Sequence, residues 1–150
     1  MKILRLMNGI SSTSAPFNQF TLGFRHIAKQ VVCCYFPPKN NKNFFNKFDT
    51  NDNIEIHSGN SSIIGVLGRL IKILNDNKFD VIHVHNGHMG IFLLIAQIIS
   101  FRNYCDRLIF TFHTNFKLLK LRNKCFICIC FLFSKYITVV SRSSFDSIPK

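Results

Sequence analysis

Histidine side chains follow two apolar stretches of this sequence, at the points where the stretches end. His85 and His88 close the stretch that begins at Phe79, and His113 closes the one that begins at Arg107. Imidazole titrates near neutral pH, so it can act as a general base or hydrogen-bond a polar substrate. A lone histidine at the end of a strand is more often structural, and that interpretation stays open for each of the three.

Polar clusters follow four predicted strands. Ligands of a doubly wound sheet bind in the crevice beyond the carboxyl ends of its strands. We therefore expect the four clusters to share one rim, although polar turns also follow buried strands for structural reasons alone. The clusters are Asn8-Gly9, His85-Asn86-Gly87-His88, His113-Thr114-Asn115 and Ser141-Arg142-Ser143.

The loop over residues 9–14 precedes a predicted helix. Its backbone N–H groups and the positive end of the helix dipole could hold a phosphate. Its sequence is neither GxGxxG nor a P-loop, and an ordinary capped turn is the competing interpretation.

The spacing of cysteine and histidine does not favour a metal site. Cys125, Cys128 and Cys130 fall inside an apolar helix and lack the second cysteine pair of a zinc ribbon, and His83 lies among apolar neighbours. We interpret the cysteines as small buried hydrophobic residues with reduced thiols. No metal is expected.

Composition predicts one folded domain. The chain has 150 residues, of which 47% are hydrophobic and 17% charged, so disorder and a complete two-domain enzyme are both excluded. Lys and Arg number 19 against 7 Asp and Glu, and a net charge of +12 suits a phosphate-rich partner, although a compositional bias could produce part of it. The longest apolar stretches are shorter than the roughly 18 to 20 residues of a membrane-spanning helix.

Hydrophobic periodicity predicts the elements that position these residues. Strand-like and helix-like segments alternate, which is typical of βαβ units and predicts an α/β, Rossmann-like parallel sheet with helices on both faces. The expected strands are 2–7, 30–36, 54–57, 79–85, 107–113 and 136–140. The expected helices are 16–27, a helix capped by Ser61 or Ser62 that buries Ile63, Leu67, Leu70 and Leu74, 89–100 and 116–133.

Residues 39–53 interrupt the alternation. They are rich in Asn and Lys and contain no aliphatic residue, which predicts a mobile surface insertion. Phe44, Phe45 and Phe48 within it could instead dock on the core or on a partner.

A basic stretch opens the last long helix. Its side chains could hold the protein against anionic lipid, and a solvated helix face is the competing interpretation. No helix-turn-helix, RNP or zinc-finger pattern accompanies the charge, so nucleic acid is not expected as a partner. The stretch comprises Lys117, Lys120, Arg122 and Lys124.

Three blocks of sequence resemble a known family in their order and spacing. FDVIHVHNGHMGIFLLIA, LIFTFHTNF and YITVVSRSSFD are similar to the N-terminal, acceptor-side domain of the retaining GT-B glycosyltransferases of family 4. The opening KILRLMNGISS resembles that family's first strand and donor-facing loop. The resemblance implies that residues 1–150 are an incomplete first domain of a GT-B fold and that the C-terminal donor-binding domain is absent.

The resemblance also implies roles for single residues. His113 matches the histidine at the reaction centre and is the implied catalytic residue. Gly9 matches the loop that faces the donor diphosphate, with Ile10 where many relatives have a second glycine. The remaining matches are His85, Asn86 and His88 in the loop that lines the acceptor pocket and Ser141 at the interdomain cleft.

Such an enzyme would move a hexose from a nucleotide sugar to a glycan or lipid-linked acceptor with retention, in cell-surface polysaccharide synthesis. The resemblance implies no cofactor besides the donor substrate. The cysteines, interpreted as reduced thiols, predict a cytoplasmic protein, and the basic stretch favours a membrane-bound acceptor, which would make the protein peripheral at the inner, anionic face of the membrane. The donor-binding residues would belong to the absent domain, which could be encoded separately, so the isolated chain is not expected to turn over. Two other classes stay open: a non-catalytic Rossmann-like binding module, and a charge-driven peripheral membrane or nucleic-acid binder.

Overall fold

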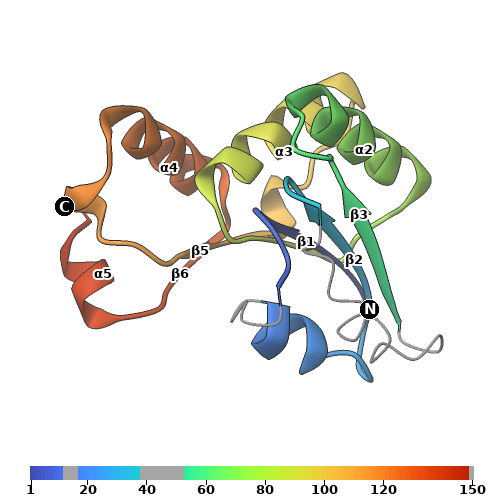
Figure 1. Ribbon diagram of the computed structural model, residues 1–150, viewed down its shortest axis with the longest axis horizontal. Helices are drawn as coiled ribbons and strands as arrows, with labels where there is room; N and C mark the ends of the chain where they lie inside the picture. Colours follow the sequence, from blue (N-terminus) through green and yellow to red (C-terminus); the bar gives the residue numbers. More distant parts are fainter. Residues whose placement is uncertain (12–16, 38–52, 149–150) are drawn as a thin grey trace.

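A computed structural model describes residues 1–11, 17–37 and 53–148. Six strands form one parallel sheet in the order β3-β2-β1-β4-β5-β6 (Figure 1). The strands are β1 (Lys2–Met7), β2 (Lys29–Cys34), β3 (Ile54–Ser58), β4 (Val81–Val84), β5 (Leu108–Phe112) and β6 (Tyr136–Val139). The strand order reverses between β1 and β4, which is the switch point of a doubly wound sheet. The predicted α/β, Rossmann-like fold is confirmed.

Helices cover both sides of the sheet. The three long helices lie together on one side in Figure 1, while η1 and α5 lie on the other. The long helices are α2 (Ile63–Asp76), α3 (Gly87–Ile99) and α4 (Leu121–Phe133), and the short ones are η1 (Phe17–Leu22), η2 (Cys105–Arg107), η3 (Phe116–Leu118) and α5 (Arg142–Asp146). None of the helices in these parts of the chain is long and apolar enough to cross a bilayer.

The larger core lies between the sheet and the three long helices. Successive strand side chains point to opposite faces, so every second residue of a strand enters this core. Its strand residues include Leu4, Leu6, Ile82, Val84, Phe110 and Phe112. A smaller cluster on the opposite face contains Met7, Ile10, Phe17, Val32 and Cys34. Burial on both faces explains why β1 and β2 are nearly continuous apolar stretches.

The expected helix over residues 16–27 is wrong beyond Leu22. The described part begins with the π-helical turn η1, and after Gly23 the chain turns, with the N–H groups of Ile27 and Ala28 both donating to the carbonyl of Phe24. Glycine disfavours helix continuation. Ile27, expected on the buried face, is therefore 67% exposed.

The buried face of α2 also differs from the expected one. Leu70 and Leu74 are buried as predicted, but Val66 and Ile73 join them, and Ile63 is 54% exposed. A Cβ on Gly65 would lie 2.4 Å from the carbonyl oxygen of Gly59, so only glycine permits this close approach of the first turn.

Smaller differences occur along the rest of the chain. The predicted turn at residues 86–88 is the N-terminus of α3, and the predicted helix 116–133 is split into η3 and α4. Cys130 is buried as predicted, but Cys125 and Cys128 are exposed because only one side of α4 packs on the molecule. The predicted insertion at 39–53, apart from Asn53, and the loop beyond Ser11 lie outside the described residues.

Candidate functional site

A cavity of about 230 Å³ opens at the carboxyl ends of β1, β4 and β5. The residues that follow these three strands form one wall, and α4 forms the other. The first wall is made by Asn8, by His85, Asn86, Gly87 and His88, and by His113 and Thr114. The α4 wall includes Asn123, Phe126 and Ile127. Three of the four predicted polar clusters therefore contribute to one site, as the rule for parallel sheets implies.

His85 and His113 contact each other on this wall. Nδ1 of His85 lies 3.2 Å from Nε2 of His113, and the two rings stack with centroids 5.5 Å apart. One ring must donate the proton of this bond, so each imidazole fixes the orientation of the other. His88, in the first turn of α3, packs edge-on against Phe126 with ring centroids 5.1 Å apart.

Burial keeps these imidazoles neutral at pH 7. It lowers the pKa of His85 to about 2, with the charges of His83, His113 and Arg5 acting in the same direction. Burial also lowers the pKa of His113, and the pKa of His88 falls through burial and the charge of Arg122. A neutral imidazole offers one donor and one acceptor, which matches the hydroxyl groups of a sugar.

Asn86 shapes the site as a helix cap. Its side-chain oxygen accepts hydrogen bonds from the backbone N–H groups of His88 (2.9 Å) and Met89 (3.3 Å). Two otherwise unsatisfied donors of the first turn of α3 are thereby paired. The cap fixes where α3 begins and so fixes the position of His88.

A buried polar row runs across the sheet beneath the cavity. Arg5 Nη1 lies 2.9 Å from His83 Nδ1, and a guanidinium can only donate, so this nitrogen accepts and the His83 proton is on Nε2. That proton is donated to Thr111 Oγ1 at 2.6 Å, and the hydroxyl groups of Thr111 and Thr138 are hydrogen-bonded to each other at 2.7 Å. At the other end, Arg5 Nε donates to the side-chain oxygen of Gln30 at 2.6 Å.

This row supports the histidine pair. The ring of His83 lies 4.0 Å, centroid to centroid, from that of His85. Burial, followed by the charges of Arg5 and His113, lowers the pKa of His83 to about 3. The interpretation of His83 as a residue among apolar neighbours is wrong, because the register pairs Arg5 with His83 on the same face of the sheet.

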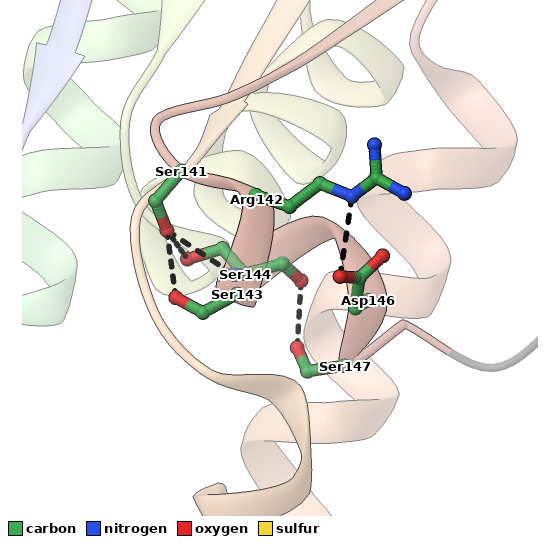
Figure 2. A network of polar contacts seen from close by, with 6 residues as sticks. All are labelled: Ser141, Arg142, Ser143, Ser144, Asp146 and Ser147. Carbon is green, nitrogen blue, oxygen red and sulfur yellow. Dashed lines mark hydrogen bonds and ion pairs between the residues drawn. The ribbon is translucent and has the colours of Figure 1, made fainter.

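Gly9 and Ser141 do not line this cavity. A Cβ on Gly9 would lie 3.5 Å from the nearest atom, Cβ of Phe36, which is an ordinary contact. Ser141 is the N-cap of α5: Figure 2 shows its hydroxyl accepting from the Ser144 N–H (3.2 Å) and contacting the hydroxyl of Ser143 (3.0 Å). Their implied roles, at the donor diphosphate and at an interdomain cleft, stay predictions.

Asn123 is a wall residue that the sequence did not indicate. Its buried side-chain oxygen accepts no hydrogen bond from the parts of the chain the structure describes. A hydroxyl donor of a bound ligand would satisfy it, since buried polar groups are normally paired. Asn123 precedes the buried Ile127 and Cys130 by four and seven residues, which places it on the inner face of α4. This helical spacing is the feature of the sequence that could have indicated its position.

The cysteines take no part in this site. The Cys130 thiol donates to the carbonyl of Gly87 at 3.6 Å, and burial raises its pKa to about 12. Cys125 and Cys128 are exposed on α4. Over residues 1–11, 17–37 and 53–148, no group of three or more His, Cys, Asp or Glu side chains is arranged to hold a metal ion.

Comparison with solved structures shows the same fold in proteins with different ligands. The crystal structure of Anabaena Alr3699/HepE in complex with UDP and glucose matches with a TM-score of 0.69 and 15% identity, over 98% of this chain and 40% of that one. A short-chain dehydrogenase/reductase (wide type) from Veillonella parvula DSM 2008, in complex with NADP, matches with a TM-score of 0.58 and 12% identity, over 92% of this chain and 67% of that one. The chain thus spans less than half the length of the HepE chain.

Comparison of sequences identifies the family. No curated protein matches the chain. The profile of Glycosyltransferase Family 4, however, matches residues 30–148, which is most of the chain and includes every strand from β3 to β6. The match covers His85, His88 and His113 on one wall of the cavity and Asn123 on the other. The chain belongs to Glycosyltransferase Family 4.

Proposed function

We propose that the chain is the acceptor-side part of a retaining glycosyltransferase. The enzyme would move a hexose from a nucleotide sugar to a glycan or lipid-linked acceptor, in the synthesis of cell-surface polysaccharide. The observation that carries the proposal is the convergence of His85, His88 and His113 in one cavity of a chain that belongs to this family.

The cavity suits a hexose in its polar groups. The bond between Nδ1 of His85 and Nε2 of His113 leaves Nδ1 of His113 as the ring nitrogen that can hydrogen-bond a ligand, and the buried oxygen of Asn123 requires a donor. A sugar hydroxyl can both donate and accept, so it suits both groups. The ring of Phe126 adds an apolar surface on the α4 wall, as sites for small molecules commonly have.

A nucleotide sugar is the donor we propose. HepE, a structural neighbour, was solved with UDP and glucose. The N-terminal end of α3 forms part of the cavity wall, and the positive end of a helix dipole favours a phosphate group. We place the main donor-binding groups in a second domain outside these 150 residues.

In the transfer, the bond between the anomeric carbon and the nucleotide diphosphate breaks, and a bond from that carbon to the acceptor oxygen forms. The diphosphate leaves with the bonding electrons, and a phosphate oxygen of this leaving group takes up the proton of the acceptor hydroxyl. We assign His113 to hold the hexose at the reaction centre through a hydrogen bond. Fixing the reacting groups in this way lowers the entropic part of the barrier.

A transfer assay tests the proposal. Residues 1–150 alone should give no glycosyl product from a UDP-hexose, and combination with the donor-binding domain should give one. In the combined enzyme, His113→Ala should lower the transfer rate by about 100-fold or more while the circular dichroism spectrum stays unchanged. Transfer by the isolated chain, or an unaffected rate in the variant, would contradict the assignment.

We also propose that the segment at η3 and the start of α4 holds the protein against the anionic, cytoplasmic face of a membrane. Leu118 and Leu121 are 82% and 77% exposed, beside the exposed side chains of Lys117, Lys120 and Arg122. Apolar side chains among cations are what an anionic lipid surface retains. This placement would bring a lipid-linked acceptor to the cavity, whose α4 wall starts two residues after Leu121.

Vesicle binding distinguishes a membrane-binding role of this surface from that of an ordinary solvated helix face. The chain should sediment with phosphatidylglycerol vesicles and not with phosphatidylcholine vesicles, and binding should weaken as salt rises. Leu118→Ser combined with Leu121→Ser should reduce binding, whereas Ile27→Ser, at an exposed site in the turn before β2, should not. Equal binding to both vesicle types would exclude the proposed role.

A further inference from the structure

A second cavity adjoins the first on the side of β1 and β2. Its volume is about 310 Å³, and Asn8 and His88 line both cavities. The remaining wall is mostly apolar, in contrast to the histidine-lined first cavity. It consists of Tyr35, Phe36, Ile63, Phe92 and Arg122.

Three aromatic rings form a fixed wall of this cavity. The Tyr35 hydroxyl donates to the carbonyl of Ser61 at 2.9 Å, which anchors its ring. Phe92 stacks on Tyr35 with centroids 6.2 Å apart, and Phe36 meets Tyr35 edge-on at 4.9 Å. Such packing restricts the rings before any ligand arrives. The stacked rings of Tyr35 and Phe92 give an apolar surface that accommodates the C–H face of a sugar ring.

Arg122 gives the cavity a positive charge. It is close enough to His88 for its charge to contribute to lowering the pKa of that imidazole, after the effect of burial. No residue that lines either cavity is acidic. Among the described side chains, no carboxylate forms an ion pair with Arg122. A guanidinium binds carboxylate and phosphate groups through paired hydrogen bonds.

We propose that the second cavity is an acceptor subsite for a saccharide that carries an anionic group, a phosphate or a carboxylate. The sugar ring lies against the wall of Tyr35, Phe36 and Phe92, and the anionic group pairs with Arg122. The inference rests on the proposed function, since an acceptor must lie next to the hexose that it receives. The shared residues Asn8 and His88 provide that adjacency.

NMR titrations of residues 1–150 with glucose, glucuronate, glucose 6-phosphate and inorganic phosphate test the subsite. Both anionic sugars should bind about tenfold more tightly than glucose and shift the ring signals of Phe36 and Phe92. Arg122→Gln should reduce this preference to less than about twofold. Lys120→Gln, a matched loss of charge two residues away, should preserve it.

A separate variant tests the proposed contact between the sugar ring and the aromatic wall. Phe36→Ala, at a half-exposed ring, should weaken all three sugars by a similar factor and leave inorganic phosphate unaffected. If inorganic phosphate binds as tightly as glucose 6-phosphate, or if glucose binds as tightly as the anionic sugars, the inference is wrong. It is also wrong if Lys120→Gln abolishes the preference as fully as Arg122→Gln.

Failure of the subsite can be told apart from failure of the proposed function. UDP-glucose should shift the imidazole signals of His85 and His113 in the first cavity. If it does so while anionic sugars leave Phe36 and Phe92 unchanged, only the subsite is refuted. If no titration shifts any signal of either cavity, both proposals fall.

Discussion

Acidification should destabilise this protein well before its carboxylates are protonated. His83 and His85 are both 8% exposed, with pKa values lowered to about 3 and about 2. In the unfolded chain each would titrate near pH 6.5, so below that pH the unfolded state binds more protons than the folded state. Stability is therefore present above pH 6.5 and is lost as pH falls toward the folded pKa values.

The size of the loss follows from these values. Between pH 7 and pH 5.5 each buried histidine should remove about 1 kcal/mol from the free energy of unfolding, and the pair roughly 2 to 3 kcal/mol. For a domain of this size that lowers the melting temperature by roughly 5 to 10 °C. Urea titrations followed by circular dichroism at several pH values measure it directly.

Two variants connect the loss to the buried row. His83→Gln should reduce the pH-dependent loss by about half, because one of the two buried imidazoles is removed. His26→Gln, at an exposed position, should leave it unchanged. A free energy of unfolding that stays constant between pH 7 and pH 5.5 would refute the conclusion that His83 and His85 are buried and neutral in the folded protein.

Three further predictions concern the helices around the site. Asn86→Ala should lower the free energy of unfolding by about 1 kcal/mol in urea titrations, through loss of the α3 cap, and Asn86→Ser should restore most of it. Gly90→Ala places a Cβ 2.3 Å from Cys130 Sγ and should lower the free energy of unfolding by about 1–2 kcal/mol. In a double-mutant cycle, adding Cys130→Ala should recover at least about 1 kcal/mol, because it removes the atom that the new Cβ meets. Strictly additive effects of the two substitutions would contradict this contact. A thiol reagent should modify the exposed Cys125 and Cys128 in the folded protein, and the buried Cys33, Cys34 and Cys130 only after unfolding. Equal modification rates at all six cysteines would contradict the packing of α4.

Four strands, β1, β2, β4 and β5, could be predicted from sequence because their burial leaves a direct record in it. Each strand of a sheet that is covered on both faces is a short apolar stretch, and β1 is predicted to the residue. The convergence of His85 and His113 also follows from sequence, since parallel strands end at the same edge. Local periodicity was sufficient for both.

The remaining features depend on contacts between distant segments. Periodicity along β4 shows only that His83 is buried, and the register with β1 is needed to place Arg5 beside it. The close approach of Gly65 to Gly59, which begins α2, is made across a loop and leaves no periodic pattern in the sequence. Asn123 joins the site only because α4 packs over the ends of β4 and β5.

The central claim is that the hexose of a nucleotide sugar lies against His85 and His113. The most direct measurement is a histidine-selective NMR titration of the chain with UDP-glucose, which follows all six imidazoles at once. Saturable shifts at His85 and His113, none at the exposed His26, and loss of the His85 shift in His113→Ala are the predicted result. Binding that leaves both cavity imidazoles unshifted, or shifts all six alike, would contradict it.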